Sequence, residues 1–418
     1  MIKEYWLYLE TYVFIWSDYR EIVLFDSLSG KGYVYSNNLK LQPLITKLED
    51  KSNLYCITIN EIELACSEIR DFVTSIRETF CGDLIDKSIY RQKPLVIIPD
   101  LNVNEEVFTG MKTIKRDLSA GIHAEKNLLE LTIYLTGKCT LDCNDCENMY
   151  KQIRWCTKNK HDLPKERLFD ILNQTSHTSV SKLVFIGGNI FSYPFWDELL
   201  RELKRFSFQK SIYINYQILP SIIKQLDVFD SNEFNICLLI DVSNNFEQIV
   251  NKVIPINKKY SYIFKVRSII EFEMVQSIID QHQIESKVFP YYDSSNRQFF
   301  EEYVFQSLDN IMNTNWKKNE VFAHTVLNTN YFGNFTISSN GKIFSNVNYK
   351  QIGDIQSDNI KMLVYQELKN GNAWLLTRNK VNPCKKCLYK YLCPPLSNYE
   401  IVLGKNNLCN IKPLSDDK

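Results

Sequence analysis

The chain has 418 residues, and its 49 Lys and Arg balance its 49 Asp and Glu. A net charge near zero gives no electrostatic footprint for nucleic acid or an anionic membrane surface, so neither partner is expected. There is no run of 18 apolar residues that could span a bilayer, and the first residues do not resemble a secretory signal peptide. We therefore expect a cytoplasmic protein of two or three domains.

Twelve cysteines in a cytoplasmic chain indicate metal or redox chemistry rather than disulfides. Three lie within residues 139–146 and four within residues 384–409. The other five are scattered and are expected to be small buried hydrophobic residues: Cys56, Cys66, Cys81, Cys156 and Cys237.

Residues 1–90 are predicted to form a small separate domain. Apolar, β-prone runs at 12–16, 22–25 and 33–35 predict three strands, and a helix over 42–49 with two further helical stretches in 60–82 follows them. This order predicts a winged-helix-like unit. Its helices are acidic and provide no basic recognition helix. The order resembles the peptide-recognition domain of many maturases of ribosomally made peptides, which binds a leader peptide as an added strand.

Residues 91–127 are predicted to be a connector, and residues 128–295 alternate strands with helices. The apolar strand runs predict a parallel sheet covered by helices, closed as a partial (β/α)6 TIM-type barrel of the α/β class. The predicted strands are 131–135, 182–186, 211–216, 235–241, 262–267 and 287–290, and the predicted helices are 165–174, 196–206, 220–229, 246–254 and 272–281.

Residues 296–418 are predicted to form a C-terminal domain. Helical stretches at 299–313 and 360–376 flank a hairpin over 335–344, whose turn is Asn340-Gly341. The segment ends in the second cysteine set, which comprises Cys384, Cys387, Cys393 and Cys409.

The first cysteine set, Cys139, Cys143 and Cys146, lies directly after the first strand of the predicted barrel. Active sites of such barrels lie at the carboxyl ends of the strands. Three thiolates can hold three corners of an iron–sulfur cluster or three positions on zinc. One metal corner then has no protein ligand, so a small molecule could bind there.

This loop on a partial barrel resembles the radical S-adenosylmethionine superfamily. The resemblance implies that Cys139, Cys143 and Cys146 bind a [4Fe–4S] cluster whose fourth iron is chelated by S-adenosylmethionine. Reductive cleavage of that cofactor gives a 5′-deoxyadenosyl radical, which abstracts a substrate hydrogen.

Two cofactor contacts of that family are altered here. A Gly-Gly-Glu stretch normally helps to hold the cofactor amine, and the matching residues are Gly187, Gly188 and Asn189. An aromatic residue normally contacts the adenine, and the matching residue is Asp145. Asn189 loses the charge-assisted hydrogen bond, which is worth roughly 1–2 kcal/mol. Two explanations of these changes remain: the cofactor site is weakened, or the catalytic function is lost.

Three polar residues near predicted strand ends are further candidates for contacts to the cofactor ribose or carboxylate. They are Asn215, Asp241 and Arg267. Polar residues at strand ends are also common caps, so the two interpretations are weighed equally.

The second cysteine set resembles the SPASM domain, an auxiliary-cluster module of peptide-modifying radical enzymes. The resemblance implies that Cys384, Cys387, Cys393 and Cys409 hold one complete [4Fe–4S] cluster, the second of two in the chain. Cysteines of a further auxiliary cluster are missing, because Ser397 and the pair Ser345-Asn346 stand in their places. A structural zinc site with four thiolates is the alternative.

Taken together, the motifs resemble the pseudo-radical-SAM SPASM proteins of Bacteroidales peptide gene clusters. The resemblance implies a maturase that modifies a short precursor peptide with a Gly-Gly leader and needs an electron donor. One alternative is a catalytically degenerate protein that binds the precursor or transfers electrons for a partner modification enzyme. A zinc-stabilised scaffold is the second alternative.

Overall fold

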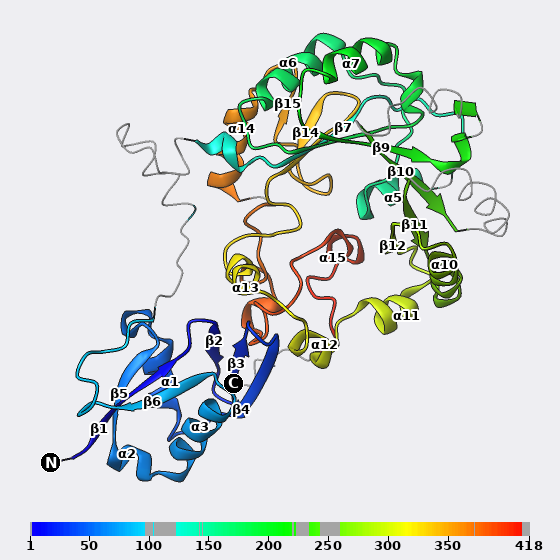
Figure 1. Cartoon of the computed structure of the whole chain (residues 1–418). Coiled ribbons are helices and arrows are strands. Elements are labelled where there is room, and N and C mark those ends of the chain that lie inside the picture. The colour runs from blue at the N-terminus through cyan, green and yellow to red at the C-terminus, as the bar shows by residue number, and fades with distance from the viewer. Residues whose placement is uncertain are drawn as a thin grey trace.

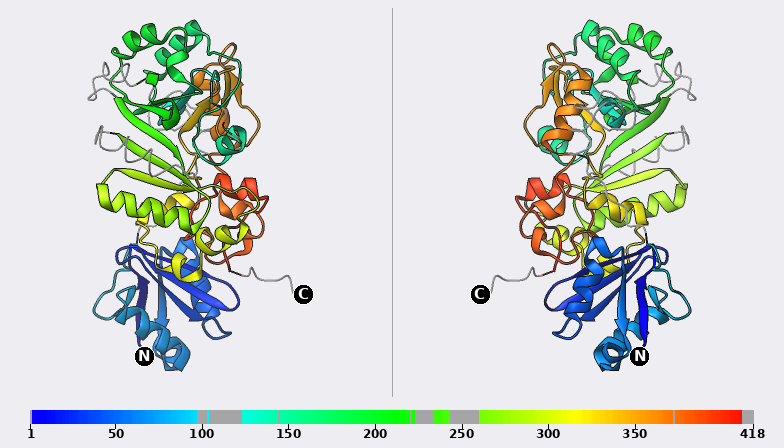
Figure 2. Two further views of the ribbon diagram at one scale, coloured as in Figure 1. Left: turned by 90° about the vertical axis from the view of Figure 1, so that its right-hand side faces the viewer. Right: turned by 90° about the vertical axis from the view of Figure 1, so that its left-hand side faces the viewer.

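The structure, a computed structural model, describes residues 2–96, 103, 123–141, 143, 145–219, 221–222, 234–242, 260–371 and 373–411. Its strands form two three-stranded sheets in an N-terminal domain and one nine-stranded sheet in a larger α/β body. Figure 2 shows the N-terminal domain at one end of the molecule and helices of the α/β body at the other. In the described chain, no helix has both the length and the apolarity needed to cross a membrane.

The N-terminal domain has two antiparallel sheets. One is a meander in the order β2-β3-β4, and the other has the order β5-β1-β6. The strands are β1 (Glu4–Leu9), β2 (Val13–Ser17), β3 (Glu21–Asp26), β4 (Lys31–Ser36), β5 (Cys56–Asn60) and β6 (Gly82–Asp86). The helices are α1 (Gln42–Glu49), η1 (Lys51–Asn53), α2 (Glu61–Ala65) and α3 (Ser67–Glu78).

The three predicted strands and the helix over 42–49 are confirmed, but the prediction missed a whole sheet. β1 pairs with β5 and β6, which lie about 50 residues or more further along the chain. Such pairing leaves no local turn signal, and β6 is a short, polar sequence. The domain is therefore larger than a unit of three strands and three helices.

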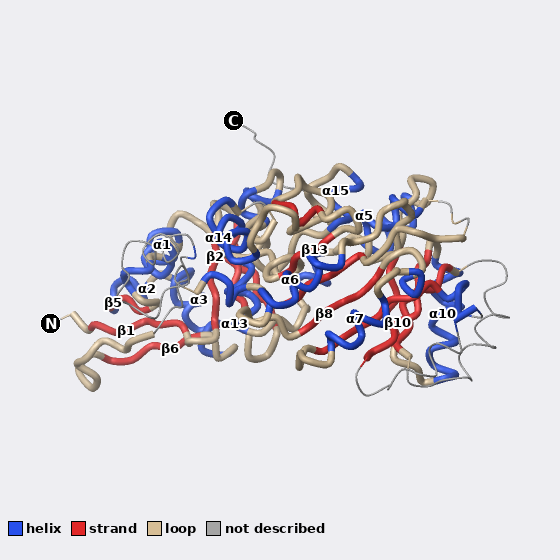
Figure 3. Tube along the Cα trace, turned by 90° about the horizontal axis from the view of Figure 1, so that it is seen from above, coloured by secondary structure: helices blue, strands red, loops and turns tan. Residues whose placement is uncertain are grey.

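The large sheet has the order β12-β11-β10-β9-β8-β7-β13-β14-β15. β7 to β12 are parallel and follow sequence order, and β13 is parallel to β7 on the other side. Figure 3 labels three strands of this sheet, β8, β10 and β13. The strands of the large sheet are β7 (Glu130–Tyr134), β8 (Lys182–Ile186), β9 (Gln209–Asn215), β10 (Phe234–Asp241), β11 (Ser261–Val266), β12 (Ser286–Pro290), β13 (Asn334–Ile337), β14 (Lys342–Phe344) and β15 (Gly353–Asp354).

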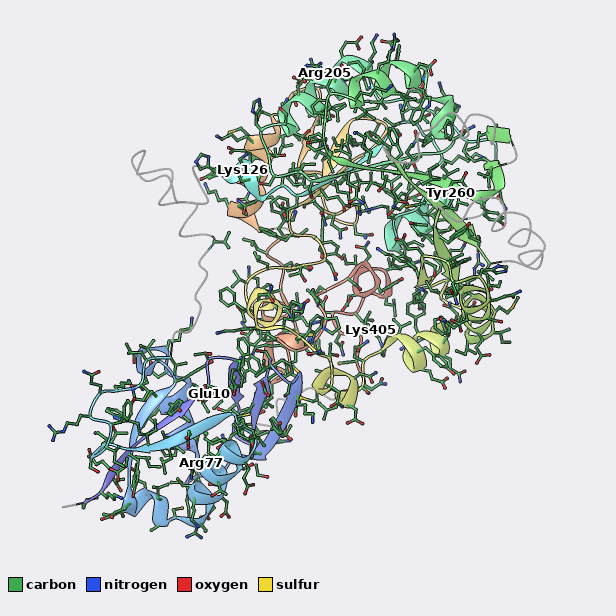
Figure 4. The ribbon with its side chains drawn as sticks, viewed as in Figure 1. Glu10, Arg77, Lys126, Arg205, Tyr260 and Lys405 are labelled. Carbon is green, nitrogen blue, oxygen red and sulfur yellow. The ribbon has the colours of Figure 1, made fainter. Side chains whose placement is uncertain are left out.

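The two faces of this sheet are buried by different elements, because alternate residues of a strand point to opposite faces. Leu131 and Ile133 of β7 belong to the outer core, which helices cover. Tyr134 of the same strand faces inward and packs with Met149 of α5. The outer helices are α6 (Lys165–Thr175), α7 (Trp196–Leu203), α10 (Ile269–His282) and α14 (Ile360–Asn370), and the inner one is α5 (Cys146–Gln152). In Figure 4, Arg205 marks the outer helical layer, and Glu10 and Arg77 mark the N-terminal domain.

All six predicted barrel strands are confirmed to within two residues at each end, and α6, α7 and α10 match predicted helices. The helices predicted at 220–229 and 246–254 and most of the connector at 91–127 lie outside the described residues. Six parallel strands in sequence order, with helices on the outer face, are consistent with a partial TIM-type barrel.

The predicted hairpin over 335–344 is confirmed as β13 and β14, but it does not belong to a separate C-terminal unit. β13 pairs in parallel with β7, so the large sheet continues beyond the predicted boundary at residue 295. The remaining elements are short: α11 (Arg297–Phe299), η6 (Phe300–Val304), α12 (Leu308–Met312), α13 (Lys318–His324), η7 (Arg378–Lys380), η8 (Cys384–Lys386) and α15 (Asn398–Leu403).

The N-terminal domain packs against this C-terminal segment. Val23 and Phe25 of β3 share a buried cluster with Tyr389 and Leu392. The Tyr389 hydroxyl donates a 2.8 Å hydrogen bond to Glu21 Oε2. The second cysteine set is thus in contact with the sheet β2-β3-β4.

Candidate functional site

The cysteine loop follows β7 at the carboxyl edge of the parallel strands. Cys139, Cys143 and Cys146 are all half-buried, and Cys146 is the first residue of α5. Cys146 Sγ lies 3.7 Å from the Cys143 carbonyl oxygen, and Cys143 Sγ lies 3.8 Å from Gln217 Oε1. The thiols of Cys143 and Cys146 therefore lie on the loop at the edge of the sheet where barrel active sites lie.

The thiols of this loop influence one another's protonation. Burial raises the pKa of Cys143 to about 11, and the neighbouring Cys146 and Cys139 contribute to that rise. Burial also raises the pKa of Cys146, with Cys139 adding to the shift. Both thiols are protonated near neutral pH, so a metal that binds here must displace protons.

Gly187 and Gly188 hold the end of β8 against the cysteine loop. The Gly188 N–H donates to the Thr136 oxygen at 2.8 Å, and a Cβ on Gly188 would lie 2.2 Å from the Lys138 oxygen. A Cβ on Gly187 would lie 2.4 Å from the Thr136 oxygen. Only glycine permits this approach of two backbones, so the pair positions the loop whether or not a cofactor binds.

Asn189 and Asn215 both cap short helices. Asn189 Oδ1 accepts a hydrogen bond from the Phe191 N–H at 3.2 Å and begins η3 (Ile190–Ser192). Asn215 Oδ1 accepts from the Gln217 N–H at 3.0 Å and begins η4 (Tyr216–Ile218). Asn215 therefore acts as a helix cap, as one of its two interpretations predicted. The side-chain oxygen of Asn189 also caps a helix.

Asp241 lies between two cations at the same edge of the sheet. Its carboxylate accepts hydrogen bonds from Lys265 Nζ at 2.7 Å and from Arg267 Nη1 and Nη2 at 3.0 and 3.2 Å. Lys265 is fully buried, and its Nζ also lies 4.7 Å from the Tyr291 ring centroid. Burial lowers the pKa of Lys265, and Asp241 opposes that shift. Glu271 also acts electrostatically on both cations, so Lys265 and Arg267 are balanced by acidic groups of the same cluster.

Lys265 was missed by the sequence reasoning. Its strand sequence, Ser-Tyr-Ile-Phe-Lys-Val, is otherwise apolar or small. A lysine in the interior of such a strand needs a partner, and that is the signal that could have identified it.

Asp145 is exposed and lies in the left-handed region with φ +66°, immediately before α5. Its side chain accepts no capping hydrogen bond from that helix. Burial raises the pKa of Tyr291 to about 12, and the charge of Asp145 adds to that shift. The Asp145 carboxylate is therefore within electrostatic range of the ring that also contacts Lys265.

The second cysteine set surrounds one cavity. Cys384, Cys387, Cys393 and Cys409 all line it, together with Arg378. Burial raises the pKa values of Cys384, Cys387 and Cys393. Four thiols that line one cavity are the residue types that a four-thiolate metal site uses.

Arg378 supports this cavity from within the core. Its Nη1 donates to Cys384 Sγ at 3.5 Å, and its Nη2 donates to Glu400 Oε1 at 2.7 Å. The side chains of Arg378 and Glu400 are only 9% and 3% exposed. The guanidinium provides positive charge beside a thiol that must be deprotonated to bind a metal.

Asn346 and Ser397, at two of the positions where further cluster cysteines are missing, form side-chain hydrogen bonds. Asn346 Nδ2 donates to Asn398 Oδ1 at 2.7 Å, and the Tyr331 hydroxyl donates to the same oxygen at 2.9 Å. Ser397 Oγ donates to Glu400 Oε2 at 2.5 Å and caps α15. Ser345 and Ser397 line one cavity, so positions that are distant in sequence meet in space.

The donor residues fit iron–sulfur clusters, for which thiolates are the usual ligands. Across the residues placed by the structure, no three His, Cys, Asp or Glu side chains are grouped so as to hold a metal ion. S-adenosylmethionine would fit beside the cysteine loop, because a cluster held by three cysteines has one iron without a protein ligand. The acceptor oxygens of Asn189 and Asp241 already accept hydrogen bonds from within the chain.

Comparison with known proteins identifies the cysteine-loop segment. The family described as a 4Fe-4S single cluster domain matches residues 129–252, which include the loop and β7 to β10. This similarity supports an iron–sulfur cluster in the segment 129–252. No curated protein matches the chain.

Several solved structures resemble the chain at 13% identity. Streptococcus suis SuiB bound to S-adenosylmethionine has a TM-score of 0.47, and SuiB bound to precursor peptide SuiA has a TM-score of 0.45. Both similarities cover 96% of this chain and 97% of SuiB. Histidine-tagged anSMEcpe with bound AdoMet has a TM-score of 0.42, covering 64% of this chain and 85% of that one. Because these TM-scores are below 0.5, no function is inferred from the similarities.

Proposed function

We propose that the chain is an iron–sulfur enzyme of the radical S-adenosylmethionine type that modifies a ribosomally made precursor peptide. The observation that carries the proposal is the cysteine loop: three thiols at the carboxyl edge of six parallel strands, fixed by Gly187 and Gly188. The match to a 4Fe-4S domain over the same segment supports it.

In this proposal Cys139, Cys143 and Cys146 hold a [4Fe–4S] cluster and leave one corner open for S-adenosylmethionine. When bound, the cluster and S-adenosylmethionine would supply radical chemistry by reductive cleavage of the cofactor, with the electron coming from a donor protein and a peptide hydrogen atom as the target. Arg267 and Lys265, which pair with Asp241, are the cationic side chains at this edge. Asp145, which is exposed, stands where the resemblance implies an aromatic contact to the cofactor.

The N-terminal domain is proposed to capture the precursor through a free edge of its sheets, where backbone hydrogen bonds give affinity. The sequence resemblance further favours a short precursor with a Gly-Gly leader and a cytoplasmic protein of a Bacteroidales peptide gene cluster. In this proposal Cys384, Cys387, Cys393 and Cys409 hold a second [4Fe–4S] cluster.

An anaerobic cleavage assay tests this function. Reconstituted protein, reduced with dithionite and given S-adenosylmethionine, is expected to release 5′-deoxyadenosine. Cys143→Ala should abolish release, whereas Cys66→Ala, a matched change at a half-buried thiol of the N-terminal domain, should retain it. No release from protein whose iron and sulfide contents match two clusters would contradict the proposal.

A second candidate function is favoured by the internal partners of Asn189 and Asp241. If these contacts persist, the chain binds the precursor, or carries electrons for a partner modification enzyme, without cleaving the cofactor. This candidate predicts tight peptide binding and no measurable affinity for S-adenosylmethionine in equilibrium dialysis. Iron, sulfide and zinc analysis of anaerobically purified protein separates both candidates from a zinc-stabilised scaffold.

A further inference from the structure

The inner face of the large sheet carries a second cavity that the cysteine loop does not line. It measures about 1290 Å³ including its mouth, and its strand residues alternate along β7 and β12, as Thr132 and Tyr134 and as Lys287 and Phe289. Arg154 lines this cavity, whereas Cys156, two residues later, contacts Asn215 on the side of the loop. The cavity is therefore a separate site on the opposite side of the segment that follows α5.

The charge of this cavity is positive. Arg154, Lys182 and Lys287 line it, and Glu130 is the carboxylate beside them. Glu130 pairs with Arg154 and, at 3.1 Å, with Lys182. Burial opposes ionisation of Glu130, but Arg154 and Lys182 hold its pKa below the usual value. Lys287 is exposed and forms no ion pair within the described residues, so two positive charges remain uncompensated.

A buried hydroxyl in the same cavity has no partner. Ser345 is 5% exposed, and its Oγ forms no hydrogen bond with any described residue. A buried polar group without a partner costs free energy, and such groups in folded proteins are uncommon. Because Ser345 lines the cavity, a ligand atom could supply the missing hydrogen bond.

The remaining walls suit an organic ligand rather than a free inorganic ion. Tyr134, Tyr150, Phe289 and Tyr399 give aromatic surface. Asn398 already satisfies the Tyr331 hydroxyl and Asn346, so its network forms a fixed wall. Aromatic surface with a few convergent polar groups is typical of small-molecule and peptide sites.

We propose that this cavity binds a carboxylate-bearing ligand of peptide size. The carboxylate pairs with Lys287 and Lys182 at the strand amino ends, an acceptor group takes the hydrogen bond of Ser345 Oγ, and apolar parts lie against the tyrosines. The carboxylate can come from an acidic residue of a peptide or from a free dicarboxylic acid. The proposal does not depend on cluster chemistry.

Calorimetric titration of the full chain tests the ligand class. The probes are the acetylated, amidated tripeptide Phe-Glu-Phe, its Phe-Gln-Phe counterpart, and glutarate. The Glu peptide is expected to bind about tenfold more tightly than the Gln peptide, because the uncompensated cations face its carboxylate. Tighter binding of glutarate than of the Glu peptide would assign the site to free acids. Equal binding of the two peptides, or no binding of any probe at about 1 mM, would overturn the proposal.

Three variants locate the site. Lys287→Met should weaken the Glu peptide about tenfold, whereas Lys204→Met, a control at an exposed lysine at the end of α7, should leave its affinity unchanged. Glu130→Gln should tighten binding, because it frees Arg154 and Lys182. Equal effects of Lys287→Met and Lys204→Met would place binding elsewhere.

Ser345→Ala separates binding from structure. It should weaken the Glu peptide about threefold while leaving the melting temperature unchanged or higher, because it removes an unpartnered buried hydroxyl. A lower melting temperature with unchanged affinity would mean that Ser345 serves the fold, and would contradict its role in the site.

Discussion

The two cysteine sites differ in how completely the protein surrounds them. The Cys139–Cys146 loop offers three half-buried thiols at an open sheet edge, with the ion pairs of Asp241 beside them. The Cys384–Cys409 set offers four thiols around one cavity, supported by a buried Arg378–Glu400 pair. Closed sites with a full ligand set stabilise a fold, whereas sites with an open position do chemistry. Under the proposed function, this difference would give the second set a structural role and the first set a reactive one.

The two cysteine sites also differ in their contacts with the rest of the molecule. The closed set lies in the buried cluster that joins the N-terminal domain to the C-terminal segment, with Tyr389 bonded to Glu21. The open loop is held by Gly187 and Gly188. Loss of the closed site should therefore loosen the N-terminal domain, and loss of the open site should not.

The largest expected effect compares one thiol from each site. Cys393→Ser should lower the melting temperature of the metal-loaded protein by about 10 °C or more, because metal binding contributes directly to folding. Cys143→Ser should change it by about 2 °C or less, because its loop lies at the sheet edge. Differential scanning calorimetry measures both. Equal shifts would remove the distinction between the sites.

The Arg378–Glu400 pair gives the next largest effect. Arg378→Met should cost about 3–5 kcal/mol of unfolding free energy, because it leaves a buried Glu400 charge without its partner. Arg297→Met breaks an exposed pair with Glu301 and should cost less than about 1 kcal/mol. Urea denaturation of the two variants provides the comparison. A small loss for Arg378→Met would mean that the closed site does not depend on this pair.

The ion pairs beside the open loop should be asymmetric. Asp241→Asn should cost about 3 kcal/mol, because Lys265 is fully buried and loses its counter-charge. Lys265→Met should cost about 1 kcal/mol or less, because Asp241 keeps both hydrogen bonds to Arg267. Denaturant titrations would contradict this assignment if Lys265→Met were the more destabilising change.

The smallest effect concerns pH and the closed site. Burial lowers the pKa of His324, although its hydrogen bond to the Tyr391 oxygen opposes the shift. The unfolded chain therefore binds a proton that the folded ring does not, so stability is full above the ordinary value of 6.5 and falls as the pH decreases below it. In thermal melts at several pH values, His324→Gln should show a weaker decrease than the parent protein. An unchanged pH dependence would exclude this ring as the source.

The sequence predicted the barrel strands well, because apolar runs of a parallel sheet are bounded by polar turns. It missed β1, β5 and β6, whose partners are distant in the chain. It also placed a domain boundary at residue 295, although β13 returns to pair with β7. Periodicity identifies strands, but it does not identify partners that are far apart in sequence.

The two candidate cysteine sites could be predicted from the sequence, because cysteines that share one loop are closely spaced along the chain. The internal partners of Asn189 and Asp241 could not be predicted, since they depend on side-chain geometry at neighbouring strand ends. The sequence alone shows that serines stand at positions 345 and 397, where the resemblance implies cysteines. That both positions line one cavity became apparent only in three dimensions.

The central claim is that the cluster at Cys139, Cys143 and Cys146 has an open corner that receives S-adenosylmethionine. Electron paramagnetic resonance of the reduced, two-cluster protein tests it directly. Adding the cofactor should shift the signal that is absent from the Cys143→Ala variant, and should leave the other cluster's signal unchanged. A spectrum that does not change at saturating cofactor would contradict the account.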